Sequence, residues 1–185
     1  MATVLLIIDV QNAILAGKAQ APRQAELDAV LDDTVLRLQH LQGKAREAGH
    51  RVILIQHDGS TGHRLEKGTT GWELRAEIAA QGDDVIIHKN SADSFFETNL
   101  DDHLKQHGIT HLIIGGCMTQ FCVDTTVRRA VSLGYDITLI ADGHMTADSE
   151  HLSYSDIIKH HNETLNGFNA GAAMITVKPA ADITF

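Results

Sequence analysis

The sequence predicts an α/β protein, a three-layer α/β/α sandwich on a Rossmann-like parallel sheet of about six strands. Two observations indicate this fold. Short apolar, β-branched runs recur along the chain and are continuous rather than alternating, as in strands buried on both faces. Segments with helical spacing separate most of them, and right-handed crossovers between parallel strands then build the three layers.

Six apolar runs are expected to form the strands. Each is bounded by polar or Gly-rich segments, which mark where a strand ends. The runs cover residues 4–9, 51–57, 84–89, 111–116, 136–142 and 172–177.

Four segments have helical patterns. In 25–49, apolar residues fall on one stripe and Gly49 is a plausible C-cap. Segments 98–108 and 119–134 also end on glycine, which readily adopts the left-handed conformation common just after a helix. The last segment, 148–167, opens with Asp148 and Ser149, both possible N-caps.

Length and composition limit the class of protein. The 185 residues suit a single domain over 1–185, and 43% hydrophobic residues suit a globular one. A net charge of −9 without a basic patch argues against nucleic-acid binding. The first apolar run is too short for a membrane span and lacks signal-peptide features. With only two cysteines, we expect a cytoplasmic protein.

Three chemically active residues follow strand ends, where parallel sheets bind ligands. Asp9 ends the first run, Lys89 ends the third, and Cys122 opens the helix after the fourth. The unpaired N–H groups at a helix start stabilise a thiolate, so Cys122 is the candidate nucleophile and Cys117 a buried packing residue. Four intervening residues do not match a Cys-x-x-Cys redox pair, and no further cysteine completes a zinc set. The competing interpretation is that the strand-end charges merely face solvent.

Four stretches carry a resemblance to the isochorismatase-like cysteine hydrolase superfamily over nearly the whole chain. They are "LLIIDVQN", "GWELRAEI", "VIIHKNSADSFFETNL" and "GITHLIIGGCMTQFCVDTTVRRAVSLGYDITLIAD", in the order and spacing of that family. The resemblance implies an Asp9–Lys89–Cys122 triad that cleaves a C–N bond of a small amide through a thioester. It also implies a non-proline cis peptide at Cys117–Met118, with the Met118 and Cys122 amides as an oxyanion hole.

The chain departs from some members of that superfamily. Nicotinamidases bind a metal through a closely spaced Asp-x-His, whereas this chain has His57, Asp58 and His63 in a different order. We therefore expect a solvated loop, no metal and no cofactor; the alternative is that these three groups, within seven residues, ligate a metal. Isochorismatases that cleave a vinyl ether commonly lack the cysteine, so Cys122 argues against that reaction. Asp93 stands where the family often has serine, which affects the local pocket wall.

Five further residues are candidates for contact with substrate. Each has an alternative role in capping or packing, which the sequence leaves open. They are Gln11, Asn12, Trp72, Phe95 and Thr119.

Other functions compete with hydrolysis. One is a binding or scaffold protein that kept the fold and lost turnover; the intact Asp9, Lys89 and Cys122 argue against it. Another is a dinucleotide-dependent oxidoreductase, but Gly115 and Gly116 lack the third glycine of that fingerprint. The expected partner is a small-molecule substrate, and the resemblance implies a homo-oligomer, a dimer or tetramer.

Overall fold

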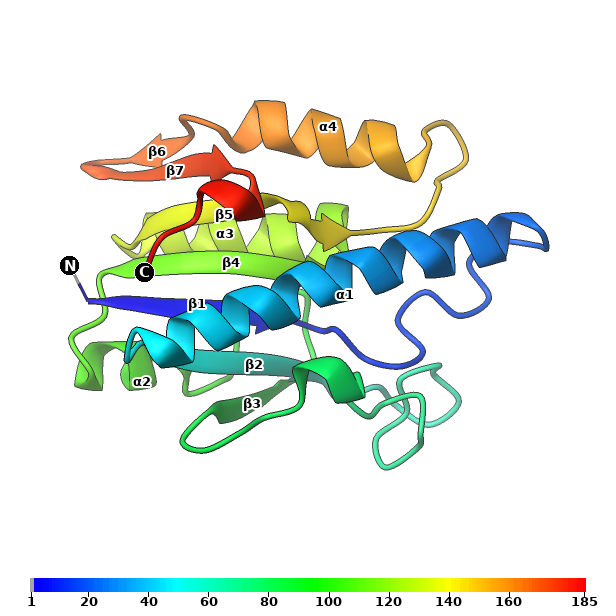
Figure 1. Ribbon diagram of the computed structural model, residues 1–185, viewed down its shortest axis with the longest axis horizontal. Helices are drawn as coiled ribbons and strands as arrows, with labels where there is room; N and C mark the ends of the chain where they lie inside the picture. The colour runs from blue at the N-terminus through cyan, green and yellow to red at the C-terminus, as the bar shows by residue number, and fades with distance from the viewer. Residues whose placement is uncertain (1) are drawn as a thin grey trace.

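A seven-stranded sheet runs through the middle of the protein, in the order β3-β2-β1-β4-β5-β7-β6. The computed structural model describes residues 2–185 and is drawn in Figure 1. The strands are β1 (Thr3–Ile8), β2 (Arg51–His57), β3 (Val85–Lys89), β4 (His111–Cys117), β5 (Asp136–Met145), β6 (Asn169–Ala170) and β7 (Ala173–Lys178).

All the long strands pair in parallel, which confirms the predicted sheet. β1 lies at the centre between β2 and β4, and Leu6 pairs with Ile53 on one side and Ile114 on the other. The two-residue β6, which was not expected, adds an antiparallel edge to β7. Because β1 to β4 run in the same direction, their carboxyl ends meet at one edge of the sheet.

Helices cover both faces of this sheet, so the three-layer arrangement is also confirmed. They are α1 (Arg23–Glu47), α2 (Leu100–Gln106), α3 (Asp124–Ser132) and α4 (Tyr154–Leu165). α1 packs on one face, while α2 and α3 pack on the other (Figure 1). α4 packs against β5 and β7.

Two helix starts differ from the prediction. The segment expected as one helix from residue 119 begins with a π-helical turn, Thr119–Val123, before α3. α4 begins later than expected, because Ser153 is its N-cap and accepts a hydrogen bond from the Asp156 amide at 3.2 Å. The predicted N-cap position, Asp148 or Ser149, is therefore wrong. Asp148 pairs with Arg23 at 2.7 Å, and its Oδ1 also accepts a hydrogen bond from the amide of Tyr154, the first residue of α4, at 2.8 Å.

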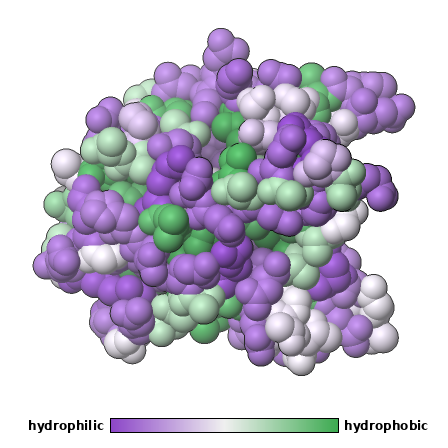
Figure 2. Space-filling view, turned by 45° about the vertical axis from the view of Figure 1, so that its right-hand side comes forward, coloured by the Kyte–Doolittle hydropathy of each residue, from purple (hydrophilic) through white to green (hydrophobic). Residues whose placement is uncertain are grey.

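The surface carries scattered apolar side chains. Figure 2 shows a largely hydrophilic face interrupted by small hydrophobic patches. Within residues 2–185, every helix is too short or too polar to cross a lipid bilayer.

Candidate active site

A buried ion pair joins the ends of β1 and β3. The Lys89 Nζ lies 2.6 Å from Asp9 Oδ2, and both side chains are at most 1% exposed. The same ammonium donates a hydrogen bond to the Ser91 carbonyl at 2.8 Å, which fixes its position. Removing one partner of such a pair would leave an uncompensated buried charge. The structure therefore brings together two of the three predicted catalytic residues.

The environment of Asp9 makes it a stronger base than an ordinary aspartate. Burial raises its pKa, whereas the charge of Lys89 and hydrogen bonds from Lys89 and Cys122 act in the opposite direction. Asp9 also has a left-handed backbone, with φ 51°, directly after β1. Such a conformation in a non-glycine residue is uncommon and recurs at functional sites.

Gly116 allows β4 to approach β1 closely just before the turn that carries Cys122. Its φ is +124°, and a Cβ at this position would lie 2.1 Å from the Ile8 carbonyl oxygen. Directly after β4, the peptide bond between Cys117 and Met118 is cis. The chain then enters the π-helical turn that carries Cys122. π-helical turns occur frequently at functional sites.

Cys122 is partly exposed and lies beside the ion pair. Burial and the Asp9 charge raise the pKa of its thiol to about 12, while Lys89 acts in the opposite direction. This differs from the expectation of a thiol ionised at rest by the helix start, because desolvation and the neighbouring carboxylate outweigh the helix amides. Cys117 is fully buried, as expected for a packing residue.

A cavity of about 230 Å³ opens in front of these residues. Both Asp9 and Cys122 line it, so a bound molecule would contact the carboxylate and the thiol together. Its lining comprises Asp9, Ile14, Lys18, His57, His63, Arg64, Leu65, Ala92, Met118, Phe121 and Cys122.

The long connection after β2 supplies one wall of this cavity. His63 in this connection and His57 at the end of β2 both line the cavity, with ring centroids 5.8 Å apart. Asp58 instead contacts Lys67 at 2.5 Å and accepts a hydrogen bond from the Trp72 indole at 2.8 Å. Among residues 2–185, no group of three His, Cys, Asp or Glu side chains is placed to hold a metal ion.

Three residues predicted to contact substrate hold the 58–72 connection in place instead: Gln11, Asn12 and Trp72. None of them is among the described residues that line the cavity. Gln11 Nε2 donates to the carbonyls of His57 and Trp72 at 3.0 and 2.7 Å, and its Oε1 accepts from the His57 amide at 3.0 Å. Asn12 Nδ2 donates to the Thr70 carbonyl at 2.9 Å. The Trp72 ring stacks on His88.

Phe95 and Thr119 are likewise not among the residues that line the cavity. Phe95 packs in the core between the sheet and α2, stacked on Tyr135. Thr119 Oγ1 lies 2.9 Å from His144 Nδ1, and His144 Nε2 lies 2.9 Å from Asn162 Oδ1. Burial lowers the pKa of His144 to about 4, so its imidazole is neutral and links α4 to the π-helical turn.

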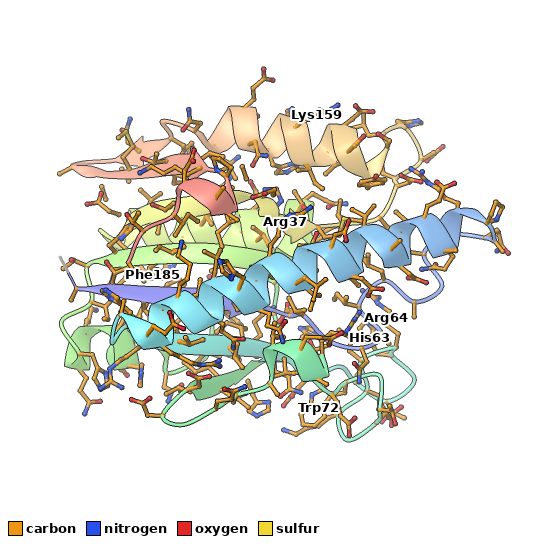
Figure 3. The ribbon with its side chains drawn as sticks, in the orientation of Figure 1. Arg37, His63, Arg64, Trp72, Lys159 and Phe185 are labelled. Carbon is orange, nitrogen blue, oxygen red and sulfur yellow. The ribbon has the colours of Figure 1, made fainter. Side chains whose placement is uncertain are left out.

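Several cavity residues escaped prediction. Lys18 lies in the connection between β1 and α1, Arg64 and Leu65 lie in the 58–72 connection, and Phe121 directly precedes Cys122. The unusual length of 58–72 was the available signal for Arg64, since long ordered loops are frequently functional. Figure 3 shows His63 and Arg64 together at the carboxyl edge of the sheet.

Known proteins resemble this chain along most of its length. A family model described as the isochorismatase domain matches residues 3–177. A streptothricin hydrolase of Streptomyces noursei is 35% identical over 78% of this chain and 50% of its own length, so the chain spans about half of that relative. A ureidoacrylate amidohydrolase of Variovorax paradoxus is 26% identical over 75% of this chain and 66% of its own. The crystal structure of an isochorismatase from Pseudomonas putida has a TM-score of 0.85 and 25% identity, covering 98% of this chain and 90% of that one.

Proposed function

The chain belongs to the isochorismatase family, and from this premise we propose that it is a cysteine hydrolase that cleaves the C–N bond of a small amide. The observation that carries the proposal is the buried Asp9–Lys89 ion pair beside Cys122 at the cavity. Two relatives named as a streptothricin hydrolase and an amidohydrolase support amide-type hydrolysis.

In the first half of the reaction, Asp9 takes the proton of the Cys122 thiol. The sulfur forms a bond to the amide carbon, and the carbonyl electron pair moves to the oxygen. The amides of Met118 and Cys122 are the proposed donors to this oxyanion. The C–N bond then breaks, Asp9 gives its proton to the departing nitrogen, and a thioester remains on Cys122.

Transfer of the proton within the site explains how a thiol with a raised pKa can react. Ionising Cys122 into solvent would leave the cluster with a net negative charge in a buried place. Moving the proton to Asp9 keeps the total charge of Asp9, Lys89 and Cys122 unchanged. Lys89 then lies beside the new thiolate, and the high pKa of Asp9 favours the transfer.

In the second half, Asp9 takes a proton from water. The water oxygen bonds to the thioester carbon, the C–S bond breaks, and the proton returns to the sulfur. The products are a carboxylic acid and an amine or ammonia. No further reactant is needed, because water supplies the oxygen and both hydrogens.

Trapping of the thioester tests this proposal. We would incubate the protein with a panel of small primary amides, measure ammonia release, and quench samples in acid for mass spectrometry of the intact chain. We expect ammonia release and an acyl adduct on Cys122, both lost in Cys122→Ala. Cys117→Ala is the matched control and should keep the adduct, since Cys117 is fully buried.

A binding protein without turnover is the alternative. It predicts that amides protect Cys122 from alkylation yet release no ammonia from the wild type. An adduct that forms equally well in Asp9→Asn would also contradict the proposal, because the base would then be unnecessary.

We further propose that the protein works in the cytoplasm as a homo-oligomer. Both cysteines are free, which suits a reducing compartment. Large apolar side chains such as Leu36 and Phe96 are more than half exposed, which supports self-association. Sedimentation equilibrium would measure the number of copies.

A further inference from the structure

Two cations line the candidate active-site cavity without an acidic partner. Among residues 2–185, no carboxylate oxygen lies within 4.0 Å of the Lys18 ammonium or the Arg64 guanidinium. Most other arginines form ion pairs, Arg23, Arg46 and Arg75 among them, although Arg51 forms none with the described residues. The chain carries 24 acidic residues and a net charge of −9, so acids are plentiful elsewhere.

The Arg64 side chain is held in place by the cavity wall. Its Nε donates a hydrogen bond to the Ile14 carbonyl at 3.0 Å, and Nη2 lies 3.7 Å from Met118 Sδ. A guanidinium has five N–H donors, so most of them are left without a strong acceptor. Fixing an arginine this way lowers the entropy lost when it binds a ligand.

The cavity as a whole is therefore positive. Asp9 is the acidic side chain in its lining, and Lys89 neutralises it. Lys18 and Arg64 remain, and their like charges repel each other. Burial and this repulsion lower the pKa of Lys18, and burial lowers that of Arg64, while a thiolate at Cys122 acts on Arg64 in the opposite direction. An anion between the two cations would relieve the repulsion.

We propose that Lys18 and Arg64 select the substrate by binding a carboxylate that it carries in addition to its amide. The inference rests on the proposed hydrolase function, because it assigns a substrate class to the same site. The amide carbon lies at Cys122 and the carboxylate lies between the two cations. Arginine suits this role, since its N–H groups match the two oxygens of a carboxylate.

The size of the cavity sets the length of the substrate. A volume of about 230 Å³ is below the range of about 300–1,000 Å³ typical of drug-sized ligands. Ile14, Leu65 and Phe121 supply apolar surface between the charged wall and the nucleophile. A short hydrocarbon linker between amide and carboxylate fits this arrangement.

Matched amides test the inference. Succinamate, succinamide and β-alaninamide have similar sizes but carry a negative, a neutral and a positive group opposite the amide. We would measure kcat/KM for each with the wild type. We expect succinamate to exceed succinamide by about 10- to 100-fold, as for hydrogen bonds to a charged group, with β-alaninamide slowest.

Charge-removing variants assign the preference to the two residues. In Arg64→Gln and Lys18→Gln, kcat/KM for succinamate should fall at least tenfold while that for succinamide changes less than twofold. Arg37→Gln and Lys159→Gln are matched controls, since both residues lie far from His63 and Arg64 in Figure 3, and they should leave both values unchanged. Equal loss for both amides, or a wild type that prefers succinamide, would overturn the inference.

A binding measurement separates this inference from the hydrolase proposal. Succinate has no amide bond, so its binding to the Cys122→Ala protein can be followed by calorimetry without turnover. If no amide is hydrolysed but succinate binds and Arg64→Gln abolishes binding, the hydrolase proposal fails and the anion site stands. If amides are hydrolysed but succinate does not bind, the anion site is refuted alone.

Discussion

Replacing Asp9 with asparagine should make Cys122 easier to alkylate while abolishing turnover. Burial and the Asp9 carboxylate both raise the pKa of the thiol, which reaches about 12, and Lys89 opposes them. In Asp9→Asn the negative charge disappears and the Lys89 ammonium, 2.6 Å from Asp9 Oδ2 in the wild type, has the thiolate as its remaining counterion. The thiol pKa should therefore fall.

The size of the effect follows from the charges. With a pKa of about 12, roughly one thiol in 10⁴ is ionised at pH 8. A charge within about 4–6 Å shifts a pKa by about 1–3 units, so removing Asp9 should raise the thiolate fraction about 10- to 1,000-fold. We would measure second-order rates of iodoacetamide labelling from pH 6 to 11, together with amide turnover.

Cys117 serves as an internal control for unfolding. Breaking a buried ion pair costs about 3–5 kcal/mol, so Asp9→Asn will be less stable and urea denaturation must accompany the labelling. Peptide mapping should find label on Cys122 alone, because Cys117 is fully buried in the folded chain. Slower labelling of Cys122 in Asp9→Asn, with Cys117 protected, would refute this account of the thiol.

Three other outcomes are expected. Gly116→Ala should destabilise the fold by about 3 kcal/mol or more in urea denaturation, because its Cβ would lie 2.1 Å from the Ile8 carbonyl oxygen. The control Gly82→Ala, at a position with φ +59° and open space around it, should cost only about 1 kcal/mol. His144 has a pKa of about 4 in the folded chain and about 6.5 in the unfolded chain, so the unfolded state binds more protons as pH falls. The free energy of unfolding should therefore drop by about 2 kcal/mol between pH 7.5 and 5. His144→Gln should remove this part of the pH dependence of stability. Gln11→Ala should remove the side-chain partner of the His57 amide and carbonyl, at a cost of about 1–3 kcal/mol, while the Trp72 carbonyl keeps its hydrogen bond from Gln56 Nε2 at 2.9 Å. Proteolysis within 58–72 should become faster, and a cleavage rate equal to that of the wild type would contradict the role given to Gln11.

Continuous apolar runs made the sheet predictable. Strands buried on both faces need such runs, and Leu6 pairs on both sides with residues from two other predicted strands. The positions of Asp9 and Lys89 followed from the same pattern, because a charge that ends an apolar run lies at a strand end. Helix starts were harder, since Asp148 is as good a cap as Ser153 by residue type alone. Its pairing with Arg23 depends on the tertiary fold.

The charge state of Cys122 and the residues of the cavity wall could not be predicted from the neighbouring sequence. The start of a helix favours a thiolate, but burial and the Asp9 carboxylate come from distant segments and reverse the effect. Similarly, nothing in the sequence around Lys18 or Arg64 marks them as neighbours, because two separate connections bring them to one cavity. Gln11 looked equally suited to contact a ligand or cap a turn, and it hydrogen-bonds to two backbone segments instead.

The candidate catalytic residues and the two cations that line the cavity lie on different parts of the fold, and this affects how such proteins can diversify. Asp9 and Lys89 are fixed to strand ends and Cys122 to the turn after β4, whereas Lys18 and Arg64 sit on connections outside the sheet. Connections accept insertions and replacements far more readily than buried strands do. Exchange of residues 58–72 should thus change the residues that contact a bound molecule, while the proposed catalytic residues Asp9, Lys89 and Cys122 stay in place.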